Sequence, residues 1–536
     1  MAASKLKLPD PPPKAKGIDA AMEQDHVAAA AGKKGGWGFV QFFFVLSVVL
    51  CVLLYAPRVF VLDRYGGGII DIASSAFTAP ADSSSSQPQR TSSSSSGVQP
   101  QQPHHHVVAG NASDDAGGDK NNHGRRRRRP AAAVLDNQVH SPCSSMRDHT
   151  ICCDRSSVHT DVCFMAGDVR TDAATLSLLL YQKKSPNATS SSEERVRPYP
   201  RKWEDYIMRK VPEVRLRPVE EDEEAAAARR CDVRHEDPLL VMSAGGYTGN
   251  LFHAFNDGFL PTWITAQHLR RRVVLGVLSY NPWWAGMFSE VIAGLSDHPV
   301  VDLLHDTRTH CFPGAIVGTR FHGILIVDPD RLRDGKTVVD FHQMLADAYE
   351  GHLKGSRRRR RRRDDNNAQG WGTRVIENQA AVARLATSVG FDVEVLDTAA
   401  GLPLSAWYAS LSACDALVGV HGADLTKFLF LRPAGRASLV QIAPLGVSPI
   451  ARECFAAPSQ RMGVVYEQYE VGAAESSLAL RYAPGDAVLA DPEAAKRAGG
   501  WPFVSRVYLG GQNVSLDLGR FRETLGRLHA HALRQR

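Results

Sequence analysis

Short apolar segments that alternate with helical segments dominate the last third of the chain. Residues 376–389 carry an amphipathic pattern that Gly390 closes, as glycine often closes a helix. The following segments then predict, in order, a strand over 391–396, a helix over 404–413, a strand over 415–420, a helix over 425–431 and a strand within 437–446. This alternation predicts a parallel sheet covered by helices.

The middle of the chain shows a similar order. Strands are expected at LLVMSAG from Leu239, at RRVVLGVL from Arg271 and at HPVVDLL from His298. Helices are expected over 250–269 and 282–295. Two such halves around a hinge predict an α/β fold made of two facing Rossmann-like domains.

Composition divides the chain into segments. Residues 1–36 form a polar tail, and residues 66–138 are rich in Ser, Gln, Pro, His and Gly. The latter segment predicts a disordered stem, because it cannot bury enough apolar surface to offset chain entropy. An arginine-rich insertion loop at 355–372 separates an N-terminal lobe, 141–354, from a C-terminal lobe, 373–536.

Residues 37–56, WGFVQFFFVLSVVLCVLLYA, are 20 residues without a charge, which matches the thickness of a bilayer. The long apolar core, followed by Arg58, favours an uncleaved signal anchor over a cleaved signal peptide. Lys33 and Lys34 precede the segment, so the short N-terminus is expected in the cytosol. The chain after residue 63 is then expected in the lumen.

Two further features agree with a lumenal body. Glycosylation sequons occur at Asn111, Asn187 and Asn513. Besides Cys51 in the apolar segment there are eight cysteines, at positions 143, 152, 153, 163, 231, 311, 414 and 454. An even number favours disulfides over a zinc site, since no Cys-x-x-Cys pair is present, but the sequence leaves the pairing open.

The net charge of +6 does not describe the folded body. Arginine runs at 125–129 and 357–363 contribute 12 of the 63 basic residues, and the remaining 51 stand against 57 acidic residues, a balance of −6. No aromatic groove accompanies the runs, so solvated loops are favoured over contacts with nucleic acid.

The segment GGYTGNLFHAFNDGFLPTW, residues 245–263, reads as an apolar helix with a polar pair on it. His253 and Asp257 are four residues apart, so they share one helix face, and Asn250 can cap the first turn. The helix follows the carboxyl end of a strand, where the pair can line a cleft and supply a general base. The alternative is a hydrogen bond between His253 and Asp257 that only fixes the helix.

The segment DALVGVHGADLTKFLFL, residues 415–431, reads as a strand, a glycine turn and the start of a helix. His421 and Gly422 fall at the carboxyl end of the strand, where open α/β sheets bind ligands. A helix N-terminus attracts anions, Gly422 allows close approach of a phosphate, and Lys427 adds a cation. The alternative is an ordinary turn whose histidine bonds its own loop.

This segment resembles the strand–HGAGLTN–helix signature of glycosyltransferase family 61, in particular its plant cell-wall branch. Further segments follow the family's order: ICCDRSSVHTDVCFMAGDVRT, GGYTGNLFHAFNDGFLPTW, CFPGAIVG, VIENQAAVARLATSVGFDVEVLD, VQIAPLG and EQYEVGAAESSLALRYAPGD. The resemblance covers Cys152 to the C-terminus. It implies a GT-B fold, an inverting metal-independent mechanism, a Golgi type II topology and a nucleotide-sugar donor. Relatives in this branch add arabinofuranosyl or xylosyl units to xylan.

The chain departs from the family's signature at two positions. Asp424 and Lys427 stand where the family has Gly and Asn. A carboxylate near a diphosphate is repelled unless it points away, and Lys427 can compensate. The resemblance places the family's phosphate-binding arginine at Arg374, in GTRVIEN, where the preceding strand is replaced by the arginine run.

Together these observations predict a Golgi enzyme that transfers a pentose from a UDP-sugar to xylan with inversion. Asp257 is the expected base, or holds His253 as the base, in the N-terminal acceptor lobe; His421, Gly422, Lys427 and Arg374 hold the diphosphate in the C-terminal donor lobe. No cofactor, divalent metal or nucleic acid is expected. Two alternatives remain: an inactive relative that scaffolds a polysaccharide synthase complex, and a lumenal carbohydrate-binding protein without a donor site.

Overall fold

A computed structural model describes residues 135–183, 192–221, 230–356, 374–396 and 402–535. The tail, the apolar segment at 37–56, nearly all of the stem and most of the arginine-rich loop lie outside these residues, as do Asn111 and Asn187. Within the described part, no helix is both long enough and apolar enough for a membrane crossing. The membrane anchor therefore stays a prediction.

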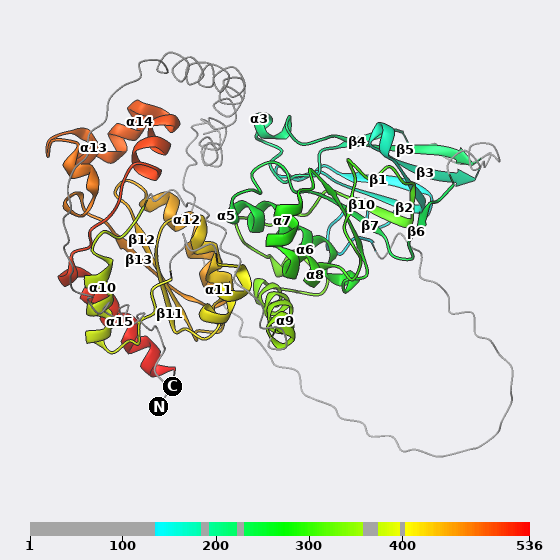
Figure 1. Ribbon diagram of the computed structural model, residues 1–536. Coiled ribbons are helices and arrows are strands. Elements are labelled where there is room, and N and C mark those ends of the chain that lie inside the picture. Colours follow the sequence, from blue (N-terminus) through cyan, green and yellow to red (C-terminus); the bar gives the residue numbers. More distant parts are fainter. Residues whose placement is uncertain (1–134, 184–191, 222–229, 357–373, 397–401, 536) are drawn as a thin grey trace, which may run out of the picture.

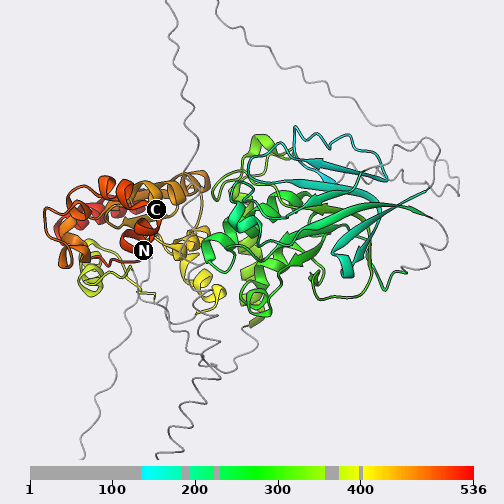
Figure 2. The ribbon, with the colours of Figure 1, turned by 90° about the horizontal axis from the view of Figure 1, so that it is seen from above.

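Two lobes, each built on its own sheet, lie side by side (Figures 1 and 2). The first lobe, up to residue 337, has a ten-stranded sheet of order β4-β5-β3-β2-β10-β7-β8-β9, with β1 on β2 and β6 on β10. Its strands are β1 (Thr150–Asp154), β2 (Val162–Asp172), β3 (Ser177–Lys183), β4 (Glu194–Val196), β5 (Val214–Glu221), β6 (Val233–Arg234), β7 (Leu239–Ser243), β8 (Val274–Leu278), β9 (Val301–Asp302) and β10 (His310–Val317).

One part of this sheet matches the sequence-based expectation. Strands β10, β7, β8 and β9 pair in parallel, and the three strands expected in this region are present as β7, β8 and β9. Strand β2 runs antiparallel to β10, β1 and β3. The first sheet is therefore mixed, which corrects the prediction of a parallel sheet. The strands before residue 239, which show no clear alternation with helices, supply the antiparallel pairs.

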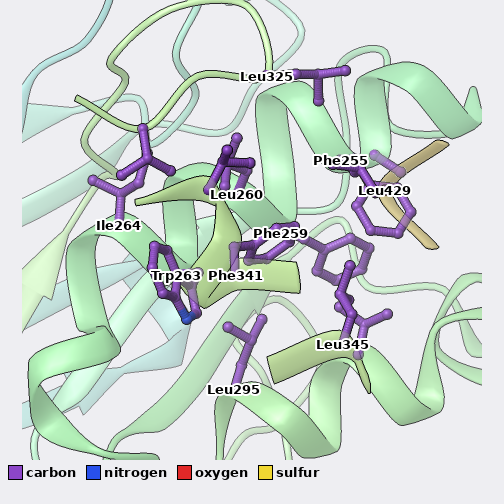
Figure 3. Close-up of a cluster of buried hydrophobic side chains, with 14 of the residues drawn as sticks. Phe255, Phe259, Leu260, Trp263, Ile264, Leu295, Leu325, Phe341, Leu345 and Leu429 are labelled. Atoms are coloured by element: carbon purple, nitrogen blue, oxygen red, sulfur yellow. The ribbon is translucent and has the colours of Figure 1, made fainter. Parts of the chain in front are cut away.

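The helix expected over 250–269 is present, with an irregular centre. It consists of α5 (Leu251–His253), the π-helical turn η4 (Ala254–Phe259), α6 (Leu260–Ala266) and the 3₁₀ turn η5 (Gln267–Leu269). Pro261 has no N–H to donate to the carbonyl of Asp257, which accounts for the wider turn before it. Apolar side chains of this helix contribute to the core that Figure 3 shows, with Phe255, Phe259 and Trp263 among them.

Further helices complete the first lobe: α3 (Asp205–Met208), α7 (Pro282–Met287), α8 (Ser289–Leu295), and the short 3₁₀ turns η3 (Ala173–Thr175) and η6 (Pro329–Arg331). Helices α7 and α8 divide the helix that the sequence predicts over 282–295. Trp284 of α7 stacks on Phe259 with ring centroids 5.3 Å apart, so this pair of helices packs on the irregular helix.

The second lobe, from residue 374, has a three-stranded parallel sheet: β11 (Ala416–Val420), β12 (Ser438–Ala443) and β13 (Val465–Glu470). Around it lie α10 (Gln379–Val389), α11 (Leu404–Leu411), η8 (Ala423–Phe430), α12 (Ser448–Met462), η9 (Ala473–Glu475), η10 (Ser477–Leu480), α13 (Ala487–Ala490), α14 (Pro492–Phe503), η11 (Val504–Leu509) and α15 (Leu518–Arg534). The α/β class is thereby confirmed, and the element at 425–431 is 3₁₀-helical.

The prediction of a strand over 391–396 is wrong. The structure describes these residues, and they pair with none of its described strands. Gly390 has a φ of +115° and closes α10, and the N–H of Phe391 donates to the carbonyl of Ala386. The first residue of the segment therefore completes the helix end. The ring of Phe391 packs against His529 of α15.

Helix α9 (Val338–Ser356) joins the two lobes. It packs against α8 in the first lobe and against α11, α12 and η8 in the second. The ring Nδ1 of His342 donates to the carbonyl of Leu429 at 2.8 Å, and Phe341 and Leu345 lie in a core that both lobes share (Figure 3). The lobes thus meet through an apolar contact as well as along the chain.

Disulfides are confirmed in the first lobe, where they join Cys143 to Cys152, Cys153 to Cys163 and Cys231 to Cys311. Cys414 and Cys454 of the second lobe are free thiols, and burial raises the pKa of each to about 12. Among the described residues, no group of three or more potential ligands could hold a metal ion.

Candidate active site

Asp257, on the π-helical turn, is the centre of a buried polar cluster. Its carboxylate lies 2.7 Å from Nδ1 of His253, 3.0 and 3.1 Å from Nη2 and Nε of Arg201, 2.8 Å from the Tyr199 hydroxyl and 2.6 Å from Nδ2 of Asn256. Burial raises the pKa of the Asp257 carboxyl, but Arg201 and His253 outweigh this and hold the pKa well below its ordinary value. Asp257 is therefore a fixed negative charge.

Arg201 is a site residue that the sequence reasoning missed. Its Nη1 donates to Oε1 of Glu204 at 2.7 Å, and Oε2 of Glu204 accepts from the hydroxyl of Tyr247 at 2.9 Å. Arg201 stands 56 positions before Asp257, and no helical spacing connects the two. The only signal was a cluster of charged and aromatic residues in PYPRKWEDY.

His253 is the member of the cluster that can act on a substrate. Its Nδ1 lies 2.7 Å from Asp257 and 3.1 Å from Nη2 of Arg201. Because a carboxylate only accepts, Nδ1 carries a hydrogen and donates it to Asp257. Its Nε2 has no hydrogen-bond partner among the described residues and is not fully buried. The side chain retains 7% exposure, against 0% for Asp257. The carboxamide of Asn250 accepts the N–H of Phe252 at 2.9 Å and caps the helix that carries His253.

The second group of predicted residues gathers where β11 ends. The N–H of His421 donates to the carbonyl of Ile442 at 2.9 Å, which continues the sheet to the turn. A Cβ placed on Gly422 would lie 3.4 Å from Cζ of Arg374, so the guanidinium lies against the bare glycine backbone. Arg374 thus lies beside Gly422, and its charge acts on His421. The phosphate-binding role that the resemblance assigns to it stays a prediction.

Arg374 is a sheltered cation. Burial lowers the pKa of its guanidinium, and Asp424 acts in the opposite direction. Among the residues that the structure defines, no carboxylate lies within ion-pair distance of it. Burial lowers the pKa of His421 to about 3, and the charge of Arg374 acts in the same direction, so His421 is neutral. A sheltered, unpaired cation favours an anionic ligand.

Asn513 holds the segment that carries Arg374. Its Oδ1 accepts the N–H of Val375 at 3.1 Å, and its Nδ2 donates to Glu377 at 3.2 Å. This asparagine is also the one predicted glycosylation position that the structure describes, and it is half-buried.

The two groups lie on elements that contact one another where the lobes meet. Helix α5, which carries His253, packs on η8, which follows Gly422. Phe455 of α12 lies between them, with its ring centroid 5.8 Å from that of Phe252 and 6.0 Å from that of His421. The imidazole of one lobe and the cation of the other therefore border the same interface.

Comparison with known proteins identifies the group to which this architecture belongs. The chain is 36% identical over 417 residues to a xylan glycosyltransferase of Arabidopsis thaliana, covering 75% of this chain and 83% of the relative. It is 32% identical to a beta-1,2-xylosyltransferase of Oryza sativa subsp. japonica, covering 70% of this chain and 82% of the relative. The chain belongs to glycosyltransferase family 61.

An alpha-1,3-arabinosyltransferase of Oryza sativa subsp. japonica, 29% identical over 70% of this chain and 64% of its own length, extends the same branch of the family. No protein-family model matches the chain. The family 61 membership inferred from the ordered sequence segments is thus confirmed by the relatives.

The two departures from the family 61 signature pair with one another. Nζ of Lys427 forms an ion pair with Asp424 and lies 3.9 Å from the ring centroid of Trp407. Lys427 is buried, whereas the Asp424 side chain is 57% exposed. The charge of Lys427 is therefore neutralised by Asp424. Arg374, in contrast, is a nearby cation that lacks a carboxylate partner among the described residues.

Proposed function

We propose that this family 61 protein transfers a pentose, xylose or arabinofuranose, from a UDP-sugar to xylan. The names of its relatives supply the sugars and the acceptor. One observation in the structure carries the proposal: the sheltered guanidinium of Arg374 lies against Gly422 at the carboxyl end of a parallel strand. A diphosphate would provide the anion that this cation lacks.

In the proposed reaction, His253 is the base and Asp257 positions it. An acceptor hydroxyl gives its proton to Nε2 of His253, and its oxygen bonds to the anomeric carbon. The bond from that carbon to the diphosphate oxygen breaks in the same step, with inversion. Asp257 stabilises the imidazolium that forms, and Arg374 stabilises the charge on the departing UDP. No step needs a metal ion.

We also propose that the two lobes form a GT-B arrangement in which the reactants meet between them. The packing of α5 on η8 supports this, because it brings residues of both lobes to one interface. We further propose that the protein is a type II membrane protein of the Golgi and that its folded body lies in the lumen. The three disulfides support an oxidising compartment.

A second candidate function is that of an inactive family member that scaffolds a synthase complex. The pairing of Lys427 with Asp424 favours it, because it removes a cation that could otherwise hold the leaving diphosphate. Binding of UDP without transfer of sugar would indicate this second function.

The test is to incubate the full-length protein with UDP-xylose or UDP-arabinofuranose and xylo-oligosaccharides, and to follow product mass. We expect an oligosaccharide heavier by one pentose, and Arg374→Ala should abolish both transfer and UDP binding. Arg384→Ala, at an exposed arginine of α10, is the matched control and should retain both. If the wild-type protein neither binds UDP nor transfers sugar, the proposed function is wrong.

A further inference from the structure

A chain of hydrogen bonds crosses the second sheet beneath His421. The carboxamide of Gln441, fully buried on β12, lies between the imidazole and Tyr466 of β13. Its Nε2 is 2.7 Å from Nδ1 of His421, and its Oε1 is 2.9 Å from the Tyr466 hydroxyl. The same hydroxyl lies 2.6 Å from Oε1 of Gln468. One hydroxyl hydrogen thus faces two amide oxygens and can serve only one.

Gln468 determines which oxygen receives this hydrogen. Its Nε2 lies 3.3 Å from the carbonyl of Ser448 and 3.1 Å from Oε1 of Glu470, and both of these groups accept hydrogen bonds. The nitrogen must therefore stay on that side, and the oxygen of Gln468 must face Tyr466. Burial raises the pKa of the Tyr466 hydroxyl, which stays protonated and donates to Gln468.

The consequence passes through Gln441 to His421. With its hydrogen committed, the Tyr466 oxygen can only accept, so the nitrogen of Gln441 has to face it. A half-turn of the carboxamide exchanges its nitrogen and oxygen at nearly unchanged positions. The oxygen of Gln441 then faces His421 and accepts from Nδ1–H. Because the imidazole is neutral, its Nε2 carries a lone pair and no hydrogen.

This Nε2 is the free end of the chain of bonds. It has no hydrogen-bond partner among the described residues and is not fully buried, and His421 keeps 7% exposure next to Arg374. We infer that Gln441 and Tyr466 position His421 so that Nε2 accepts a hydrogen bond from a hydroxyl of the bound nucleotide sugar, while Arg374 holds the phosphates. The inference rests on the proposed function for the identity of the ligand. It assigns His421 to a sugar hydroxyl instead of the diphosphate oxygens.

The position of the proton can be measured without any ligand. Solid-state ¹⁵N NMR of the full-length protein, with labelled histidine, distinguishes a protonated from an unprotonated ring nitrogen, and subtraction of the His421→Asn spectrum isolates His421. His342 is an internal reference, because its Nδ1 donates to a backbone carbonyl. We expect His421 to carry its hydrogen on Nδ1. A wild-type His421 protonated on Nε2 would overturn the inference.

The role of the chain of bonds is tested with Tyr466→Phe. Without the hydroxyl, Gln441 can turn freely, and His421 should show both tautomers. Tyr469→Phe is the matched control: it lies on the same strand, but its hydroxyl bonds Glu475, so the His421 signal should not change. An unchanged tautomer in Tyr466→Phe would show that Gln441 and Tyr466 do not position His421.

Ligand binding tests the assignment to a hydroxyl. His421→Phe should weaken UDP-xylose binding by about threefold to tenfold, the loss of one hydrogen bond, and leave pyrophosphate binding unchanged. An equal loss for pyrophosphate would place His421 on the phosphates and overturn the assignment. If the wild-type protein binds no UDP-xylose, the proposed function fails, and the NMR result still decides where the His421 proton lies.

Discussion

Arg201 holds Asp257 with two nitrogen atoms, Nη2 at 3.0 Å from one carboxylate oxygen and Nε at 3.1 Å from the other. Both side chains are buried, with 6% and 0% exposure. The pair fixes the carboxylate that in turn orients His253. The candidate base therefore depends on a residue from a separate segment of the chain.

His253→Gln should lower turnover by on the order of 10²-fold or more, because glutamine cannot take the proton from the hydroxyl group of the xylan acceptor. It leaves Asp257 and Arg201 paired, so melting temperature and UDP affinity should stay close to the wild-type values. Steady-state kinetics with calorimetry checks this. His305→Gln is the control, since His305 forms a comparable bond with Asp302, at 2.8 Å, on the surface. Normal turnover in His253→Gln would exclude His253 as the base.

Arg201→Met should lower the free energy of unfolding by about 3–5 kcal/mol, because it leaves the Asp257 carboxylate buried without its main partner. Urea titration measures the change. Arg215→Met, at an exposed arginine of β5, should alter it by less than about 0.5 kcal/mol. Equal effects of the two substitutions would mean that the buried pair contributes nothing specific.

Asp424→Gly should leave UDP affinity equal or higher. The substitution removes the carboxylate that pairs with Lys427, and the ammonium group is then free to turn towards a diphosphate. Isothermal titration with UDP measures the affinity. Loss of UDP binding would contradict this prediction and show that UDP binding requires Asp424.

Replacing Cys231 and Cys311 by serine should destabilise the first lobe more than replacing Cys143 and Cys152. The disulfide between Cys231 and Cys311 spans 80 positions, whereas that between Cys143 and Cys152 spans 9. The longer loop restricts the unfolded chain more. The chain-entropy relation gives about 4.5 against about 2.7 kcal/mol. Urea titration of the two double variants compares the losses, and equal losses would contradict this prediction.

Cys414 and Cys454 should resist alkylation by iodoacetamide at pH 8. Burial raises the pKa of both thiols to about 12, so little thiolate forms in the folded protein. An unfolded thiol ionises near pH 8.5, so the two thiols favour the folded state below that pH, and this contribution is lost as the pH rises towards 12. Peptide mapping by mass spectrometry measures modification at each position. Rapid labelling of the native protein at either cysteine would be inconsistent with this environment.

The sequence predicts those elements whose signals are local. Strands β7, β8, β11 and β12 are short apolar runs between turns, and α10 has an amphipathic pattern closed by Gly390, so neighbouring residues suffice to predict them. The strand expected over 391–396 shows the limit, because a strand also needs a partner, and none of the described strands pairs with this segment.

The site shows the same division. His253 and Asp257 can be predicted as a pair, because a helix places residues four apart on one face. Arg374 can be predicted only because GTRVIEN resembles a segment of the family. Arg201 has no such local signal, since its partner lies 56 positions away. The pairing of Lys427 with Asp424 has the right spacing, i and i+3, but only the structure shows that Trp407 covers the ammonium group.

Helix α9 sets a limit on exchanging parts between this protein and its relatives. Consider a chimera that joins the first lobe of this protein to the second lobe of a relative within the arginine-rich loop. Helix α9 would stay with the first lobe and would have to pack against the second lobe of the relative. The relative's lobe would then have to supply a carbonyl group for His342 where Leu429 supplies one here. It would also have to supply an apolar surface that matches Phe341 and Leu345. A junction before Val338 moves the helix together with the lobe that supplies those contacts, although it transfers the mismatch to the packing of α9 on α8.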